Sequence, residues 1–530
     1  MPRLEQICEN FTPDNTTRDF RLWCTTYPSP VFPVSVLQNG VKMTIEPPKG
    51  LKANLTGSFS TPPIADEGFL DSCGKGVLFR KLLFSLCLFH ALLQERRLFG
   101  PLGWNIPYGF NASDLEISIQ QLRMFLDENE SVPFAALKYC VGACNYGGRV
   151  TDAKDRRTLN SILDRFFNDG VVAVDNFSLS ESGIYTIPPS AETLEDFLAW
   201  IEALPLVAEP EIFGFHENAN ITKDAKETNT LFATILLTEG GGSSGGASSN
   251  ADDAITSTAT EILNKVPAEF DIEAARVKYP VRRDESMNTV LVQELGKFNN
   301  LTKLIKSSLI SVIRACKGEV VMTGELEKFG HALEIGAIPS AWKTKSYPSF
   351  KSCAAYVADL LARLEFFGTW LEDKPPNSYW ISAFFFSHAF FTASKQNLAR
   401  KDAIPIDALG FRYEMVPPAA SAEPPTVGVY GYGLFFEAAR WDGDAKLLKD
   451  SYPKVLFSPA PLMLFEPKKI DRICHPPGCY SCPVYKTGDR RGVLATTGHS
   501  TNFIMDILVP SDKPESHWIQ RGTALLSQLD

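Results

Sequence analysis

The stretch CNYGGRVTDAKDRR, residues 144–157, is the first candidate for chemistry, since two adjacent glycines precede an arginine and a cluster of charge. A glycine-rich loop cradles phosphate when it joins a strand to a helix and carries the pattern G-x-x-x-x-G-K-[ST]. Gly147-Gly148-Arg149 lacks the lysine and follows a helical pattern instead of a strand. We therefore predict a turn, in which the glycines end one helix and Thr151 or Asp152 caps the next.

Two other stretches partly match a phosphate loop. GFLDSCGKG, residues 68–76, has one residue too many and a glycine after its lysine. ELGKFNN, from residue 294, lies inside a long helical pattern. We expect this chain to bind no nucleotide by itself and to need no cofactor.

The stretch CHPPGCYSC is the sharpest metal-site candidate. Zinc favours sets of cysteine and histidine, and Cys479-x-x-Cys482 has the spacing found in zinc fingers. Cys474 and His475, however, are adjacent, and the sequence offers no second well-spaced pair. We predict no zinc site, with zinc binding kept as an alternative.

A hydrolase would need a nucleophile with a base in reach. His90 and His388 lie in apolar helical patterns, so both are predicted in the core. His499 sits beside Ser500 in a turn between strand patterns, but no G-x-S-x-G motif accompanies it. The histidines therefore do not predict hydrolysis.

Composition and net charge limit which classes of protein the sequence can represent. The 530 residues are 44% hydrophobic and 22% charged, with a formal net charge of −10. This charge argues against broad binding of nucleic acids, because affinity for phosphate backbones comes from basic residues. The eleven cysteines form no even framework, which favours a reducing compartment.

We also predict no membrane span and no secretion signal. The apolar run from Leu82 to Leu93 is shorter than the roughly 20 residues that cross a bilayer. The start MPRLEQICENF has no apolar signal core. An intracellular protein is the expectation.

The elements that would position these residues change in type along the sequence. Residues 18–45 read as two strands around a proline-rich turn. Amphipathic or apolar helical patterns follow, over residues 78–97, 113–128, 155–167, 190–204, 286–316, 350–371 and 384–400.

Two further segments complete the outline. The tract from Glu239 to Asp253 is rich in glycine and serine and predicts a flexible loop. After Pro405, short β-rich runs alternate with turn residues and predict a small barrel or sandwich, with a helical turn and a strand at the end. The fold class is therefore α+β, mostly α-helical.

Several long strings resemble one known family. FRLWCTTYPSPVFPVSVLQNGVKMTIEPPKGLKANL, FHALLQERRLFGPLGWNIPYGFNASDL and CNYGGRVTDAKDRR together resemble the sixth AAA+ module of a dynein heavy chain. YPVRRDESMNTVLVQEL, PIDALGF and CPVYKTGDRRGVLATTGHSTNFI resemble the dynein C-terminal domain. The resemblance covers nearly the whole sequence and is strongest to axonemal heavy chains of the single-headed inner-arm kind.

The resemblance implies a domain organisation. Residues 1–48 would hold the last strands of an AAA+ large subdomain, and residues 49–205 its helical small subdomain, or lid. Residues 206–404 would form the helical part of the C-terminal domain, with residues 405–530 as its β-barrel. The chain would then be a C-terminal fragment or a truncated gene product.

The resemblance also implies a role. In this family the sixth module binds no nucleotide, and ATP and Mg²⁺ bind in other modules. The chain would be a noncatalytic part of an ATP-driven, minus-end-directed motor of the cytoskeleton, in the axoneme of a cilium or flagellum. Its partners would be the other AAA+ modules, intermediate and light chains, and microtubules through a stalk outside this sequence, without nucleic acid or membrane.

Within this resemblance, Gly147 and Gly148 make a turn between lid helices, while Arg149, Asp155 and Arg156 are candidates for salt bridges within the ring. The sequence departs from the family pattern at Ala143, where an acidic residue is usual. It departs again at Ala153-Lys154, in place of an acidic–aromatic pair.

Two alternatives remain open at this point. One is a stand-alone zinc or hydrolytic protein that uses the Cys474–Cys482 cluster or His499. The other is an independent scaffold that uses a dynein-like tail as a binding module. Metal analysis of the protein would distinguish the zinc protein from part of a motor. A long reading frame with phosphate loops upstream of this sequence would favour part of a motor over the independent scaffold.

Overall fold

The computed structural model describes residues 2–12, 14–26, 32–43, 46–189, 192–239, 249–283, 285–473, 478–493 and 500–529. They fall into two compact units, Met1–Lys49 and Gly50–Asp530.

The first unit contains two short helices, α1 (Pro2–Glu9) and α2 (Val34–Asn39). The two strands predicted over residues 18–45 were wrong, because the described residues of this unit form helices and irregular backbone. A strand needs a neighbouring strand for its backbone N–H and C=O groups. Here the apolar side chains that suggested strands stay exposed, including Trp23 at 76% and Val41 at 92%.

The second unit begins with a helical region, residues 50–218, which we call the lid region. Its helices are α3 (Leu51–Phe59), α4 (Gly76–Arg96), α5 (Ala112–Glu128), α6 (Phe134–Lys138), α7 (Ala153–Phe166), α8 (Asp169–Ala173) and α9 (Leu194–Glu202). Short turns add η1 (Phe69–Asp71), η2 (Arg97–Leu102), the π-helical η3 (Tyr139–Asn145) and η4 (Pro210–Phe213). The helices predicted here are confirmed within a few residues at each end.

Helix α4 is the centre of the lid region. It is apolar nearly all round, and the other lid helices bury it in one hydrophobic core. In the described residues one helical stretch, Gly76–Leu102, is long and apolar enough to cross a membrane by composition alone. It is longer than the run read from the sequence, but 78% of its apolar window lies buried in the protein, as in the core helix of a globular domain.

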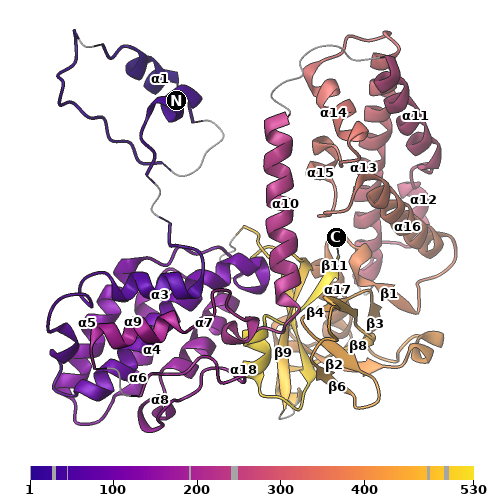
Figure 1. The fold of residues 1–530 in the computed structure, drawn as a ribbon. Helices are drawn as coiled ribbons and strands as arrows, with labels where there is room; N and C mark the ends of the chain where they lie inside the picture. The colour runs from indigo at the N-terminus through magenta and orange to yellow at the C-terminus, as the bar shows by residue number, and fades with distance from the viewer. Residues whose placement is uncertain are drawn as a thin grey trace. The chain divides into compact units, whose positions relative to one another are not determined.

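The C-terminal region, residues 219–529, begins with helices, and its strands come later in the sequence. Its helices are α10 (Ala219–Glu239), α11 (Ser249–Lys265), α12 (Ile272–Lys278), α13 (Ser286–Cys316), α14 (Gly324–Glu334), α15 (Ser340–Lys345), α16 (Cys353–Glu372), α17 (Ser387–Lys401) and α18 (Glu515–Arg521). Figure 1 shows α11, α14, α15 and α16 arranged around α13. The bounds predicted for α13 are confirmed, and its 31 residues extend over about 46 Å at 1.5 Å per residue.

The flexible tract predicted from Glu239 to Asp253 falls mostly on residues 240–248, which lie outside the described residues. Its end is different from the prediction, since α11 already begins at Ser249. Asp252 lies in the first turn of α11, where a carboxylate interacts favourably with the helix dipole.

Strands follow α16 and α17. They are β1 (Ser378–Trp380), β2 (Leu409–Val416), β3 (Val429–Tyr432), β4 (Phe435–Glu437), β5 (Arg440–Asp442), β6 (Leu447–Lys449), β7 (Phe457–Pro459), β8 (Leu462–Lys469), β9 (Cys479–Thr487), β10 (Phe503–Pro510) and β11 (Ala524–Gln528). Short helical turns η5 (Ile381–Ala383), η6 (Ile406–Ala408), η7 (Pro418–Ala422) and η8 (Ile470–Arg472) join them.

These strands form three separate sheets in the described residues. Their orders are β1-β3-β8-β2, β10-β9-β11-β4-β7 and β5-β6. The α+β class, mostly α-helical, is therefore confirmed, whereas the predicted small barrel finds no support, because none of the sheets in the described residues closes on itself. The longest strands are divided between two sheets, with β2 and β8 in one and β9 and β10 in the other. In the described residues no hydrogen-bonded strand pair joins the edges of these sheets.

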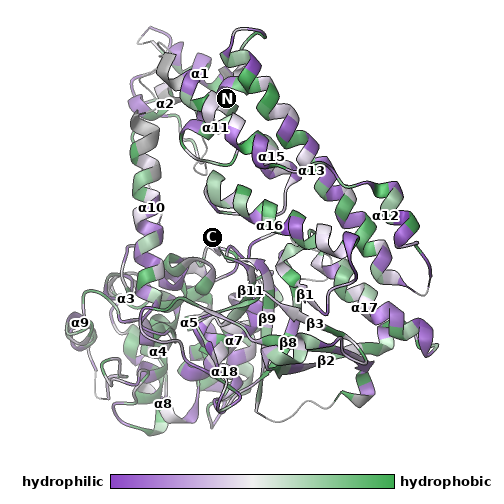
Figure 2. Ribbon diagram, turned by 90° about the vertical axis from the view of Figure 1, so that its right-hand side faces the viewer, coloured by the Kyte–Doolittle hydropathy of each residue, from purple (hydrophilic) through white to green (hydrophobic). Residues whose placement is uncertain are grey.

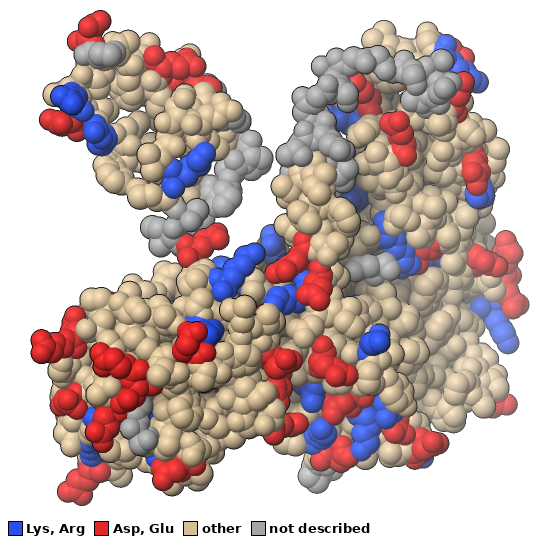
Figure 3. All heavy atoms as spheres, in the orientation of Figure 1, with Lys and Arg blue, Asp and Glu red and all other residues tan. Residues whose placement is uncertain are grey.

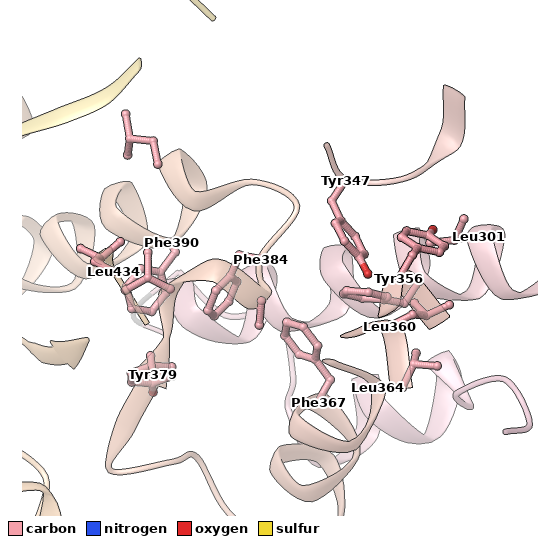
Figure 4. Close-up of a cluster of buried hydrophobic side chains, with 14 of the residues drawn as sticks. Leu301, Tyr347, Tyr356, Leu360, Leu364, Phe367, Tyr379, Phe384, Phe390 and Leu434 are labelled. Atoms are coloured by element: carbon pink, nitrogen blue, oxygen red, sulfur yellow. The ribbon is translucent and has the colours of Figure 1, made fainter. Parts of the chain in front are cut away.

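The helices and strands of the C-terminal region share one core. Figure 4 shows Leu301 of α13 beside Leu360 and Leu364 of α16, and the cluster extends through Phe384 to Leu434 beside the strands. Purple and green residues alternate along α13 (Figure 2), as expected for a helix with one buried face. Because one core joins α13 to the sheets, we expect these elements to move together.

Candidate functional site

The glycine pair lies in a tight turn after η3. A Cβ on Gly147 would stand 2.2 Å from the carbonyl oxygen of Gly142, and one on Gly148 would stand 2.6 Å from that of Cys144. The Gly148 N–H donates to the Cys144 oxygen at 3.1 Å. The glycines therefore allow the backbone to approach itself closely, and the predicted turn is confirmed.

Arg149 and Arg156 make contacts inside the lid region. The Arg149 Nε atom lies 2.8 Å from a carboxylate oxygen of Asp114, which also closes the N-terminal cap of α5 with Asn111. Arg156 donates to the carbonyl oxygen of Val150 at 2.9 Å. Salt bridges from these arginines to other ring modules stay a prediction.

Asp155 is buried at the start of α7. Its carboxylate accepts the backbone N–H groups of Asn105 at 2.9 Å and Ile106 at 3.2 Å. Burial, with Asp152 close by, raises the pKa of Asp155 from its ordinary 3.8 to about 7. Asp152 caps α7 by accepting from Lys154 N and Asp155 N, as the sequence predicted. Asp155 thus connects α7 to the segment that follows η2, through backbone hydrogen bonds.

The opposite side of α7 faces the C-terminal sheets. Lys154 Nζ lies 2.6 and 2.7 Å from the two carboxylate oxygens of Asp506 on β10. One turn further along, Arg157 donates to the carbonyl oxygen of Ser481 on β9 at 3.0 Å. Lys154 is one of the departures from the family pattern, and here it binds the C-terminal region directly.

Arg96 is the most deeply buried charge between the two regions. It has no exposed surface, and its guanidinium donates to the carbonyl oxygens of Phe213 and Gly103 in the lid region and of Gln520 on α18. The guanidinium also lies 4.2 Å from the ring centroid of Phe215. Burial lowers the pKa of Arg96 to about 9, so the side chain remains charged at neutral pH.

Neutral side chains extend this interface. Asn105 donates to the Tyr485 hydroxyl on β9 at 2.8 Å. Gln520 donates to the carbonyl oxygen of Ser161 on α7 at 2.9 Å and accepts from Arg165 at 3.2 Å. Because each of these groups is half-buried or buried, its loss would leave a partner without a hydrogen bond.

A second group of bonds lies where the lid region ends. Asn218 donates to the carbonyl oxygens of Tyr452 and Val455, at 2.8 and 3.0 Å, and accepts from the Lys454 N–H at 2.7 Å. One side chain thus satisfies three backbone groups of the loop between β6 and β7. We call the contacts between the lid region and the C-terminal region the lid–sheet interface. They involve Arg96, Asn105, Lys154, Arg157, Gln520 and Asn218.

Among the residues that the structure describes, no group of histidine, cysteine and carboxylate side chains could hold a metal ion. Cys474, His475 and His499 lie outside the described residues. Cys479 and Cys482 both belong to β9, and their spacing of three places them on opposite faces of the strand. Cys482 is fully buried, and burial raises the pKa of its thiol well above the usual range.

The two helical histidines differ. His90 is buried, as predicted, with Nδ1 2.8 Å from the Tyr146 hydroxyl, and burial lowers its pKa to about 4. The prediction that His388 belongs to the core was wrong. It is exposed on α17, because the buried face of that helix carries Phe390 and Phe391.

The residues of the lid–sheet interface were not predicted from the sequence. Arg96 carried a usable signal, since it is a cation at the end of an otherwise apolar helix. Lys154, Arg157 and Gln520 carried none, because each is a polar residue of a helix and its partner lies more than three hundred residues away.

Comparison with known proteins agrees with this division of the sequence. Residues 225–527 match the C-terminal domain of the dynein heavy chain. Residues 79–219 match the AAA lid domain of the dynein heavy chain. Residues 1–44 match the region D6 P-loop domain of the dynein heavy chain.

Longer relatives align over all of this sequence. It is 50% identical over 532 residues to dynein axonemal heavy chain 12 of Mus musculus and 51% identical over 535 residues to dynein axonemal heavy chain 3 of the same species. It is 48% identical over 532 residues to dynein axonemal heavy chain 1 of Rattus norvegicus. Each alignment covers 100% of this chain but only 17%, 13% and 12% of the respective relative.

Proposed function

Since this chain belongs to the dynein heavy chain family, we propose that it closes and braces the AAA+ ring of an axonemal motor without catalysing ATP hydrolysis itself. Residues 49–205 would serve as the lid of the sixth AAA+ module, and residues 206–530 as the C-terminal domain. The preceding residues would belong to the large subdomain of that module. The intact heavy chain would move along microtubules toward their minus ends.

The lid–sheet interface is the observation that carries the proposal. It joins α4 and α7 of the lid region to β9, β10 and α18 through buried charges and hydrogen bonds, and residues 50–530 form one compact unit. A partner shifts a conformational equilibrium only through contacts that differ between the two states. A C-terminal domain held rigidly on one lid can make such contacts with neighbouring modules.

The remaining assignments follow from the family. We place ATP and Mg²⁺ in other modules of the heavy chain, as the family implies, and the Gly148 N–H is already used by the Cys144 carbonyl oxygen inside its own turn. The partners would be those other modules, intermediate and light chains, and microtubules bound through the stalk. The location would be the axoneme of a cilium or flagellum, with the single-headed inner arm as the arm type.

The surface is consistent with docking through local contacts. Figure 3 shows acidic side chains gathered over part of the lid region, whereas both signs are mixed over the C-terminal strands. The net charge of −10 adds no general attraction to acidic surfaces.

The test uses the full heavy chain with Lys154→Ala and Arg157→Ala combined. The control combines Lys265→Ala and Arg276→Ala, two cations in exposed helical pairs of the C-terminal region. We expect the interface variant alone to change gliding velocity or stall force while ATP turnover stays largely intact. Thermal melting verifies that both proteins fold. Equal gliding and equal force in two folded proteins would show that the domain is no brace.

A second measurement addresses the assignment of nucleotide. Calorimetric titration of the 530-residue protein with Mg-ATP should show no saturable heat. Saturable binding in the micromolar range would contradict a noncatalytic role for this part of the heavy chain.

A further inference from the structure

An open groove of about 470 Å³ lies where the end of α16 meets β1 and β3. Its size falls within the range of ligand-binding clefts. Four aromatic side chains from three elements line it, namely Phe366 and Trp370 of α16, Trp380 of β1 and Tyr432 of β3. Figure 1 shows β1 beside β3 at the edge of the four-stranded sheet.

Neighbouring residues hold these rings in place. Trp380 stands directly opposite Tyr432 in the parallel pairing of β1 with β3. The Phe366 ring lies 6.3 Å from the Trp380 ring, edge to face, and the buried Arg363 guanidinium lies 5.2 Å from the Trp380 centroid. Trp370 is only 2% exposed and forms the floor. The groove is therefore preformed, which lowers the entropy lost when a ligand binds.

The rings also bring hydrogen-bond donors. Within the described part of the protein, neither the indole N–H of Trp380 nor the hydroxyl of Tyr432 donates to any protein acceptor. The Trp370 Nε1 also has no partner, but it is fully buried and is not available to a ligand. Tyr432 is 39% exposed, so its hydroxyl can reach a ligand. A ligand with unpaired carbonyl oxygens would complement such donors.

The charge at the groove is acidic. Glu365 and Asp373 line it, against the single cation Lys374. All three are exposed. The C-terminal end of α16 is already capped by Lys278, whose ammonium donates to the carbonyl oxygens of Leu371, Glu372 and Asp373, so the charge preference of the groove rests on the exposed carboxylates of Glu365 and Asp373. A basic group on the ligand is thus favoured over an acidic one.

We propose that this groove binds a proline-rich segment of a partner protein, in polyproline II conformation, with a lysine or arginine next to the prolines. Such segments expose ring faces that pack on aromatic side chains, and their backbone carbonyls have no internal hydrogen bonds. The ring walls, the free donors and the acidic rim each match one of these properties. The site is separate from the lid–sheet interface and does not depend on the bracing role.

The test measures binding of a fluorescein-labelled oligoproline peptide with an arginine pair at one end to the 530-residue protein, by fluorescence polarisation. Comparison peptides carry glycine and serine in place of proline, glutamates in place of arginine, or alternating valine and threonine. We expect saturable binding of the arginine–proline peptide and weaker binding of the other three. Tight binding of the valine–threonine peptide would indicate strand addition to β1 and would overturn the proposal.

Variants locate the site. Tyr432→Ala should raise the dissociation constant about fivefold, as expected for the loss of one aromatic contact. Asp373→Asn should raise the dissociation constant by a smaller factor than Tyr432→Ala, and its effect should be larger at low salt than at high salt. The controls are Phe350→Ala, which removes a 57% exposed aromatic elsewhere, and Asp66→Asn. Melting curves identify any variant that unfolds. Absence of saturable binding, or equal affinity of wild type and folded groove variants, would show that the groove is not the site.

Discussion

Lys154 on α7 holds both carboxylate oxygens of Asp506 on β10, at 2.6 and 2.7 Å, although 352 positions separate the two residues. The pair is partly shielded, with side-chain exposures of 14% and 36%. It is one of the contacts that make the lid region and the C-terminal sheets one unit.

Removing this pair should destabilise the protein modestly. We expect Lys154→Ala to lower the free energy of unfolding in urea by about 1 kcal/mol, since partly shielded ion pairs exceed exposed ones only slightly. Lys265→Ala, which breaks an exposed pair within α11, should have a smaller effect. A double-mutant cycle with Asp506→Asn should give a coupling energy that accounts for most of the loss. Additive effects would mean that the pair contributes nothing.

Loss of Arg96 should be much more damaging. Its guanidinium donates to three carbonyl oxygens, and Arg96→Met would leave these buried acceptors without a donor. We expect a loss of about 3 kcal/mol in urea unfolding. The conservative variant Arg96→Lys should recover only part of the stability that Arg96→Met loses. Its ammonium can still donate hydrogen bonds but cannot reach all three acceptors at once. A melting curve for Arg96→Met that equals wild type would contradict this account.

The glycine turn predicts a steric effect. Gly147→Ala would place a Cβ 2.2 Å from backbone oxygen, so the turn must open. We expect a loss of about 2 kcal/mol or more. Gly57→Ala is the matched control, because it lies within α3 and its Cβ would meet nothing within 4 Å. This control should leave stability unchanged or raise it slightly, since alanine favours helix. Equal melting temperatures for the two variants would argue against a tight turn.

Asp155 predicts how stability depends on pH. Its pKa is raised from 3.8 to about 7 in the folded protein. Between about pH 4 and pH 7 the folded state therefore holds a proton that the unfolded state has lost, and stability falls as pH rises through this window. The stability of wild type relative to Asp155→Asn should thus be greater at pH 5 than at pH 8.

Urea unfolding of both proteins at each pH measures this difference. Other titrating groups, including the buried Glu294 whose pKa is also raised to about 7, cancel because both proteins contain them. Asp66→Asn at an exposed position serves as the control. A difference between wild type and Asp155→Asn that does not change with pH would show that Asp155 stays ionised.

Local patterns in the sequence determined most helices and several strands. The apolar spacing along residues 286–316 predicted α13 at both ends, because a helix with one buried face must repeat its apolar residues every three to four positions. The glycine turn and the Asp152 cap were predictable for the same reason, since neighbouring residues decide them. Family membership was also readable from the sequence, through long strings in order.

The tertiary structure alone decided the pairing of strands and the lid–sheet interface. Short β-rich runs predict strands but not their partners, so separate sheets could not be distinguished from a barrel. The predicted strands of residues 18–45 were wrong because a strand pattern becomes a strand only when a partner is paired with it. Arg96, Lys154 and Gln520 meet partners that are distant in sequence, and no local rule brings such groups together, because burial and backbone approach depend on the whole packed core.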